Sequence, residues 1–251
     1  MIQYEYPFNE RTRTFLRLEH LFRRLGALVL REDALDHHFA LVTIFEVMEV
    51  AARADLKADV LKELERQKQA FNAYRGNPAI SESVLDRVID QIDHCFHELN
   101  GLPGKAGQGL TENEWLMNIR ARIGIPGGTC EFDLPSYYAW QQGSTASRRA
   151  DLEHWSSTLG PLAQSLYLLL KILRDSGSPQ KMMAIGGQFQ LNLPQGRSFH
   201  LLRLRLDSVQ TAIPEISANR LMVSIRMMSK STDERLVQLT EDVPFELSLC
   251  S

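Results

Sequence analysis

A basic stripe near the N-terminus is the first set of side chains whose spacing could support binding. Its members recur at i, i+4, i+7 and i+11, and they are Arg13, Arg17, His20 and Arg24. On an α-helix this spacing defines one face, whereas Phe15, Leu18 and Phe22 fall on another. Glu10 is the only acid aligned with the stripe, so we expect an unneutralised basic face that suits an acidic peptide or protein partner. The competing interpretation is an ordinary solvated helix face.

Further arginines flank a turn-rich and aromatic segment in the middle of the chain. Arg120 and Arg122 precede Ile125-Pro126-Gly127-Gly128, and Tyr138 and Trp140 follow soon after. Other basic positions that could join them are Arg148, Arg203, Arg205 and Arg226. Arginine and aromatic residues dominate interface hot spots. If the fold gathers several of these side chains, the result is a basic groove with aromatic anchors; each one alone is ordinary surface.

No set of residues has the spacing of a catalytic or metal centre. The glycine-rich stretch 101–109 contains Lys105 but lacks the Gly-Lys-Ser/Thr pattern of a phosphate-binding loop, so we interpret it as a flexible linker. Asp90, His94 and His97 share a predicted helix face, but a metal centre needs further ligands, which favours a polar surface stripe. No nucleophile elbow is present. We therefore expect no enzymatic activity, no cofactor and no metal.

The composition is that of an ordinary globular protein. The 251 residues are 44% hydrophobic and 24% charged, and the net charge of -3 favours neither nucleic acid nor a membrane. The N-terminus lacks a signal-peptide pattern, and the longest apolar stretch, 166–173, is too short to cross a bilayer. Three widely spaced cysteines, Cys95, Cys130 and Cys250, are typical of a reducing compartment. We expect a cytoplasmic protein that binds neither nucleic acid nor membrane.

Hydrophobic periodicity predicts helices first and strands last. A helical period runs from Asn9, a plausible N-cap, to about Arg174. After Ser176-Gly177-Ser178-Pro179 the period changes to two. The alternating segments that we predict as strands are 202–207, 221–227 and 245–250, with a further short strand at 130–134. Cys250 is expected to be a buried thiol on an edge strand.

The fold class that these elements predict is α+β, with a predominantly helical N-terminal domain packed with a C-terminal antiparallel β-domain. The helical domain is expected over residues 1–123 and 136–176. The β-strand domain is expected over residues 124–135 and 177–251.

Two blocks of residues are distinctive enough to indicate a family. The first is Asn9-Glu10 followed by Arg13-Thr14-Phe15-Leu16-Arg17-Leu18-Glu19. The second comprises Arg120, Arg122, Ile125 to Gly128, Cys130, Phe132 to Pro135 and Trp140; Leu61 to Leu64 with Arg66-Gln67 agrees as well. From about Tyr6 to the C-terminus the chain resembles the ZapD family of bacterial cell-division proteins.

The resemblance implies an α-helical domain with a β-domain, a homodimer, and a place at the mid-cell division ring. It also implies binding to the C-terminal tail of the tubulin-like GTPase FtsZ, a mixed acidic and apolar peptide. By position, Arg17 matches a family residue implicated in that binding. A dimer that holds two tails would cross-link and bundle FtsZ protofilaments and so promote Z-ring assembly.

The chain also departs from the family pattern. Tyr138 stands where a histidine is expected, Glu114 where an arginine is expected, and Cys250-Ser251 where a Cys-Cys pair is expected. The alternative function is a nucleic-acid-binding regulator that uses Arg13, Arg17 and Arg24. The net negative charge and the absence of a helix-turn-helix signature argue against it.

Overall fold

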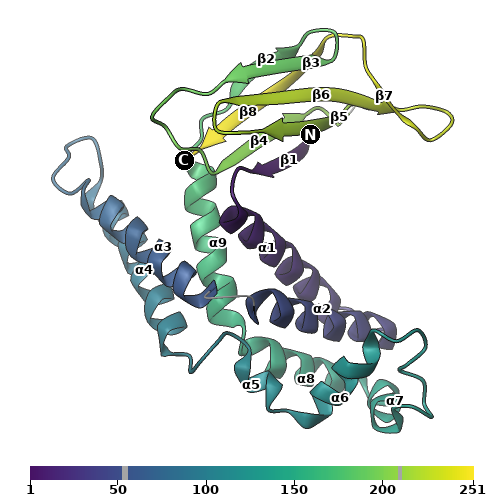
Figure 1. Ribbon diagram of the computed structural model, residues 1–251. Coiled ribbons are helices and arrows are strands. Elements are labelled where there is room, and N and C mark those ends of the chain that lie inside the picture. Colours follow the sequence, from purple (N-terminus) through teal and green to yellow (C-terminus); the bar gives the residue numbers. More distant parts are fainter. Residues whose placement is uncertain (53–55, 209–210) are drawn as a thin grey trace. The chain divides into compact units, whose positions relative to one another are not determined.

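The computed structural model describes residues 1–52, 56–208 and 211–251 and confirms the α+β class (Figure 1). Its helices are α1 (Glu10–Val29), α2 (Ala34–Ala52), α3 (Leu56–Asn72), α4 (Glu82–Gly101), α5 (Gln108–Thr111), α6 (Glu114–Ile123), α7 (Pro135–Gln142), α8 (Thr145–Ser157) and α9 (Gly160–Asp175). Its strands are β1 (Ile2–Pro7), β2 (Gln180–Ala184), β3 (Gln188–Asn192), β4 (Leu201–Leu206), β5 (Ile213–Ala218), β6 (Met222–Lys230), β7 (Leu236–Gln238) and β8 (Val243–Cys250).

The chain divides into two compact units. The β unit comprises Met1–Leu16 and Leu170–Ser251, and the helical unit comprises Arg17–Leu169. Helix α1 begins in the β unit and ends in the helical unit, and α9 does the reverse. The change of period after residue 179 is confirmed, because α9 ends at Asp175 and β2 begins at Gln180.

Two antiparallel sheets pack around a shared core in the β unit (Figure 1). The first has the strand order β1-β4-β8-β2 and the second the order β3-β6-β5, with β7 also paired to β6. Leu204 of β4, Ile225 of β6 and Phe245 of β8 point into that core, so the three long alternating strands are confirmed. The alternation predicts one buried face for each strand. In the structure the buried face of each sheet packs against the other sheet.

The sequence pattern does not predict strand β1. It pairs antiparallel with β4, placing Tyr4 opposite Leu204, and it therefore brings the N-terminus into the β unit. Asn9 then begins α1 as predicted: its side-chain Oδ1 accepts a hydrogen bond from the backbone N–H of Thr12 at 2.8 Å. Cys250 is buried as expected, but it lies on β8, which is flanked by β4 and β2 and is not an edge strand.

The strand predicted at residues 130–134 is wrong, because this segment forms turns. The backbone carbonyl of Cys130 accepts hydrogen bonds from the N–H groups of Asp133 (3.1 Å) and Leu134 (2.9 Å). Such local bonds satisfy the backbone without a neighbouring strand. Residues 124–135 consequently belong to the helical unit and not to the β-strand domain.

Helix α2 is the centre of the helical unit. It contacts α3, α6, α7 and α8, and its apolar character agrees with burial on several sides. Ile44 of α2, Ile119 of α6, Tyr137 of α7 and Leu152 of α8 are almost completely buried. This packing positions the segment between α6 and α7. Among the described helices, none is both long and apolar enough to cross a membrane.

Candidate functional site

Helix α1 carries the predicted basic stripe, but two of its charges are compensated. Arg13 Nε lies 3.1 Å from Glu10 Oε1, as expected from their spacing of three residues on one helix face. Arg24 pairs with Glu46 of α2. The expectation of an unneutralised stripe is therefore wrong at Arg24, since Glu46 comes from a different helix and its approach depends on tertiary packing.

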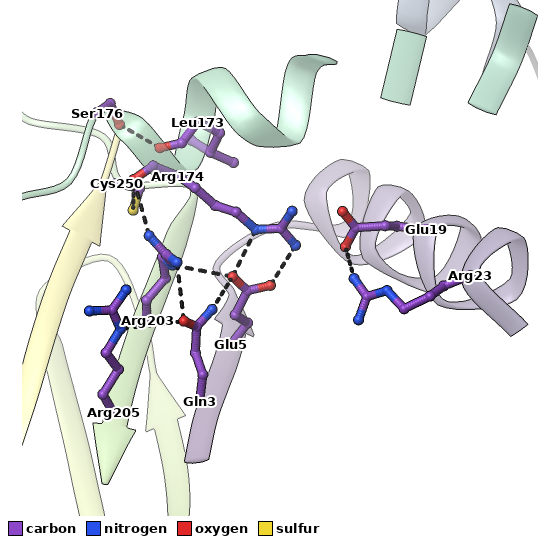
Figure 2. Close-up of polar contacts among 10 residues, drawn as sticks. All are labelled: Gln3, Glu5, Glu19, Arg23, Leu173, Arg174, Ser176, Arg203, Arg205 and Cys250. Carbon is purple, nitrogen blue, oxygen red and sulfur yellow. Dashed lines mark hydrogen bonds and ion pairs between the residues drawn. The ribbon is translucent and has the colours of Figure 1, made fainter. Parts of the chain in front are cut away.

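The stripe keeps its charge at its centre. Arg17 and His20 are exposed, and within residues 1–52, 56–208 and 211–251 no ion pair is found for either side chain. The neighbouring Arg23 differs, because its Nη2 lies 3.2 Å from Oε2 of the buried Glu19 (Figure 2). Arg17 and His20 are thus the stripe residues that remain available to an acidic partner.

The end of α6 and the turns that follow it form a second exposed surface. Arg120 is half-buried, and the exposed Arg122 places its Nη1 3.4 Å from Asp133 Oδ1. Phe132 is 78% exposed, the largest exposed fraction among the described large apolar side chains, while Ile125 is 50% and Tyr138 43% exposed. We call Arg120, Arg122, Ile125, Phe132 and Tyr138 the α6–α7 surface. The sequence does not indicate Ile125 and Phe132 as site residues; for Phe132 the reason is the strand that alternation predicts at 130–134.

Trp140 lies within an aromatic cluster. Its ring stacks on Tyr137 with a centroid separation of 5.6 Å, and it contacts Trp115 and Trp155 at 6.0 and 6.1 Å. Its indole N–H donates a hydrogen bond to Asp151 Oδ2 at 2.9 Å. These contacts join α7 to α6 and α8, so the ring packs the helical unit and only part of it faces solvent.

Tyr137 connects this aromatic cluster to helix α2. Its hydroxyl lies 2.6 Å from Nδ1 of His38. Burial raises the pKa of Tyr137 and lowers the pKa of His38, because each loses hydration of its charged form. The hydroxyl and the imidazole share this hydrogen bond, and the pair fixes α7 on α2.

Arg148 is only 5% exposed, which contradicts its predicted place on a binding surface. Its Nε donates to His37 Nδ1 at 3.0 Å, and its Nη2 donates to the carbonyl oxygen of Glu32 at 2.9 Å. Its Nη1 donates to the carbonyl oxygens of Gln141, at 3.0 Å, and Gly143. The carbonyls of Gln141 and Gly143 lie at the C-terminal end of α7, which Arg148 therefore caps, and the carbonyl of Glu32 lies just before α2. The sequence could not predict this burial, because it depends on how the helices pack and not on the residue type.

Arg203 and Arg205 lie on the face of β4 that points away from the core, and each pairs with an acid on a neighbouring strand; Figure 2 shows the pair of Arg203 with Glu5. Glu5 on β1 stands opposite Arg203 in register and pairs with its Nε at 3.3 Å. Both oxygens of Glu5 also accept hydrogen bonds from Arg174 at 2.8 Å. Arg205 lies 3.8 Å from Glu246. Glu5, Arg174 and Arg203 are each less than 20% exposed, so this cluster fixes the end of α9 to the first sheet.

Arg226 lies on the second sheet. It alternates with core residues on β6, as Arg203 alternates with core residues on β4, so the two arginines face opposite sides of the β unit. Its Nη2 pairs with Glu215 at 2.8 Å, and both side chains are more than 40% exposed. The structure consequently does not bring Arg226 together with Arg203 and Arg205.

Metal-ligating residues do not converge in the part of the chain that the structure describes. No group of three or more histidine, cysteine, aspartate or glutamate side chains there could hold a metal ion. Asp90, His94 and His97 are exposed along α4. Cys250 is buried, and burial raises the pKa of its thiol.

Taken together, these features define an α+β protein in which Arg17 on α1 and the α6–α7 surface present exposed cationic and apolar side chains on the helical unit, while the β-unit arginines predicted as site residues are paired with acids. Residues 16–226 match the family model described as ZapD, a cell division protein. A relative named cell division protein ZapD, from Janthinobacterium sp. (strain Marseille), is 50% identical over 251 residues and covers 100% of both chains. The chain belongs to the ZapD family of cell division proteins, as the resemblance indicated, and has a role in cell division.

Proposed function

We propose that this protein is a non-enzymatic assembly factor that binds the C-terminal tail of FtsZ. As a homodimer at the mid-cell division ring, it would cross-link FtsZ protofilaments into bundles and promote Z-ring assembly. Membership of a cell-division family supports a partner within the division machinery. The mixed acidic and apolar character that the family resemblance gives to the tail matches a surface of arginines and apolar side chains.

The α6–α7 surface is the observation that carries this proposal. Phe132, on the turns after α6, is 78% exposed, and the next residue, Asp133, pairs with Arg122 near the end of α6, so an exposed apolar side chain adjoins the acid of an ion pair. Exposed aromatic and arginine side chains of this kind are the usual hot spots of interfaces. Arg17 on α1 offers additional positive charge, and the exposed His20 a further hydrogen-bonding group, to the same class of partner.

The expected energies agree with a weak single-site interaction. An exposed ion pair contributes only about 0.2–1 kcal/mol, and burial of one phenylalanine contributes about 1.5–3 kcal/mol. Micromolar affinity requires about 8 kcal/mol, so several such contacts have to act together. Two tails held by one dimer on a polymer would bind with avidity well above the single-site affinity.

Charge reversal on the two basic surfaces tests the proposal. The variants are Arg17→Glu and Arg120→Glu, and bundling of GTP-polymerised FtsZ is followed by light scattering and sedimentation. Both should bundle less than the wild type, and the loss should resemble that caused by raised salt. Lys62→Glu is the matched control, since Lys62 is an exposed cation on α3 outside both surfaces. Wild-type bundling by both arginine variants would contradict the proposed binding surfaces.

A further inference from the structure

A pocket of about 760 Å³ lies within the β unit, and its lining includes none of the residues proposed above. It is lined by the connection between β3 and β4 (residues 193–200), by the turn between β5 and β6 (residues 219–221), and by Phe8 and Asn9 before α1. Its volume falls within the range of about 300–1,000 Å³ that is typical of ligand sites.

The charged side chains of this pocket are all basic. Arg197 and Arg220 are exposed, and among the described residues no ion pair or side-chain hydrogen bond is found for either. His200 lines the pocket as well, and the lining residues include no aspartate or glutamate. The nearest acid along the chain, Glu10, pairs with Arg13. A cavity with this charge favours an anionic occupant.

Hydrogen bonds hold the walls of the pocket in place. Asn9 Oδ1 accepts the N–H of Thr12, so its Nδ2 faces His200 Nδ1 at 2.9 Å and donates to it. The backbone N–H of Leu193 donates to the carbonyl oxygen of Leu221 at 2.7 Å, which joins the two loops that line the cavity. Walls that are formed before binding lower the entropic cost of association.

Apolar side chains complete the lining and indicate the kind of anion. Leu221 is 65% exposed at the β5–β6 turn, and Phe8 and Phe199 are partly buried against the shared core of the two sheets. Because the two phenylalanine rings pack on that core, they are poorly placed to stack on bases. Arginines beside an aliphatic side chain instead suit a peptide with carboxylates next to an apolar residue.

We propose that this pocket binds an acidic peptide segment that carries an apolar side chain, and that the FtsZ tail supplies it. This inference rests on the proposed function and adds a contact on the β unit to the α6–α7 surface. Arg197 and Arg220 would bind carboxylates, and Leu221 would cover the apolar residue.

The test measures fluorescence anisotropy of a fluorescein-labelled synthetic peptide of the FtsZ C-terminal tail with the full-length protein. The double variant R197E/R220E should bind about tenfold more weakly or worse, because two attractive charges become repulsive. Leu221→Ala leaves the charge unchanged and should weaken binding about threefold or more by removing apolar contact area. Arg235→Glu, a reversal at an exposed arginine just before β7, should bind as the wild type does. Thermal melts followed by circular dichroism establish that every variant is folded.

The outcomes separate the pocket from the proposed function. Wild-type binding with unchanged affinity in R197E/R220E would overturn the pocket assignment and leave tail binding intact. If the wild type does not bind the peptide, both proposals fail. A parallel titration with labelled duplex DNA tests nucleic acid as the alternative occupant of the pocket. If DNA binds more tightly than the peptide and R197E/R220E loses that binding, the peptide assignment is overturned as well.

Discussion

Arg148 Nε donates a hydrogen bond to His37 Nδ1 across 3.0 Å, and the two side chains are only 5% and 0% exposed. His37 Nε2 lies 2.9 Å from the carbonyl oxygen of Arg31. Since Nδ1 accepts from Arg148, Nε2 carries the ring proton and donates it to that carbonyl. The pair therefore joins the start of α2 to α8 and to the end of α7, inside the helical unit.

Replacing Arg148 should destabilise the fold and not merely weaken a partner contact. Arg148→Ala leaves several buried carbonyl oxygens and His37 without their donor, which should cost about 3–5 kcal/mol of unfolding free energy. Lysine cannot reproduce the planar fork of donors, so Arg148→Lys should restore little. Urea denaturation measures both variants. Arg120→Ala on the half-buried Arg120 is the control and should cost about 1 kcal/mol or less. A loss below about 1 kcal/mol for Arg148→Ala would contradict the structural role.

Two glutamate substitutions compare a partly buried ion cluster with an exposed pair. Glu5→Gln removes the charge that compensates Arg174 and Arg203, all three being less than 20% exposed, and should cost about 3 kcal/mol. Glu215→Gln breaks an exposed pair with Arg226 and should cost less than about 1 kcal/mol. Both are Glu→Gln changes opposite an arginine on a neighbouring strand. Equal melting temperatures for the two variants would show that the Glu5 cluster contributes no more than a surface pair.

Stability should fall as the pH drops from 7 toward 5, and His38 should account for part of that fall. Burial lowers the pKa of His38 below its usual value of 6.5, so the unfolded chain binds a proton that the folded chain resists. The unfolded state then binds more protons, and stability is lost as the pH falls through 6.5 toward the folded pKa. His38→Asn should reduce this slope in urea titrations at several pH values. His154→Asn, at an exposed position on α8, should leave the slope unchanged; the same slope in all three proteins would refute the assignment to His38.

Phe132→Ser should weaken FtsZ bundling without affecting folding. The side chain is 78% exposed, so its removal should change the unfolding free energy by less than about 0.5 kcal/mol. If the ring is buried on binding, the affinity for the FtsZ tail should fall about tenfold or more. Leu236→Ala removes another exposed apolar side chain, on β7 of the β unit, and serves as the control. Bundling that is equally strong in Phe132→Ser would exclude this residue as the anchor.

The long elements could be predicted because local pattern and tertiary environment agree in them. Leu202, Leu204 and Leu206 alternate with polar residues on β4, and each turns toward the shared core. The predicted strand at 130–134 shows the limit of that logic. Its five residues alternate as a strand would, but the carbonyl of Cys130 is satisfied by Asp133 and Leu134 within the same turn. Alternation alone does not supply a neighbouring strand.

The site could be predicted by residue type but not by environment. Arg17 and Arg148 look alike in sequence, yet Arg17 is exposed and Arg148 is enclosed by the carbonyl oxygens of helix ends. Arg24 looks unpaired until α2 places Glu46 beside it. Each difference depends on contacts between residues that are far apart in the chain, and such contacts leave no periodic signal.

The central claim is that this protein recognises the tail of FtsZ, and co-sedimentation tests it most directly. Wild-type protein is mixed with GTP-polymerised FtsZ, either full-length or lacking its C-terminal tail, and pelleting and bundling are measured. The account predicts that the protein pellets with the full-length polymer and bundles it, and that it does neither with the truncated one. Equal pelleting with both polymers would move the binding site to the globular domain of FtsZ and contradict the account.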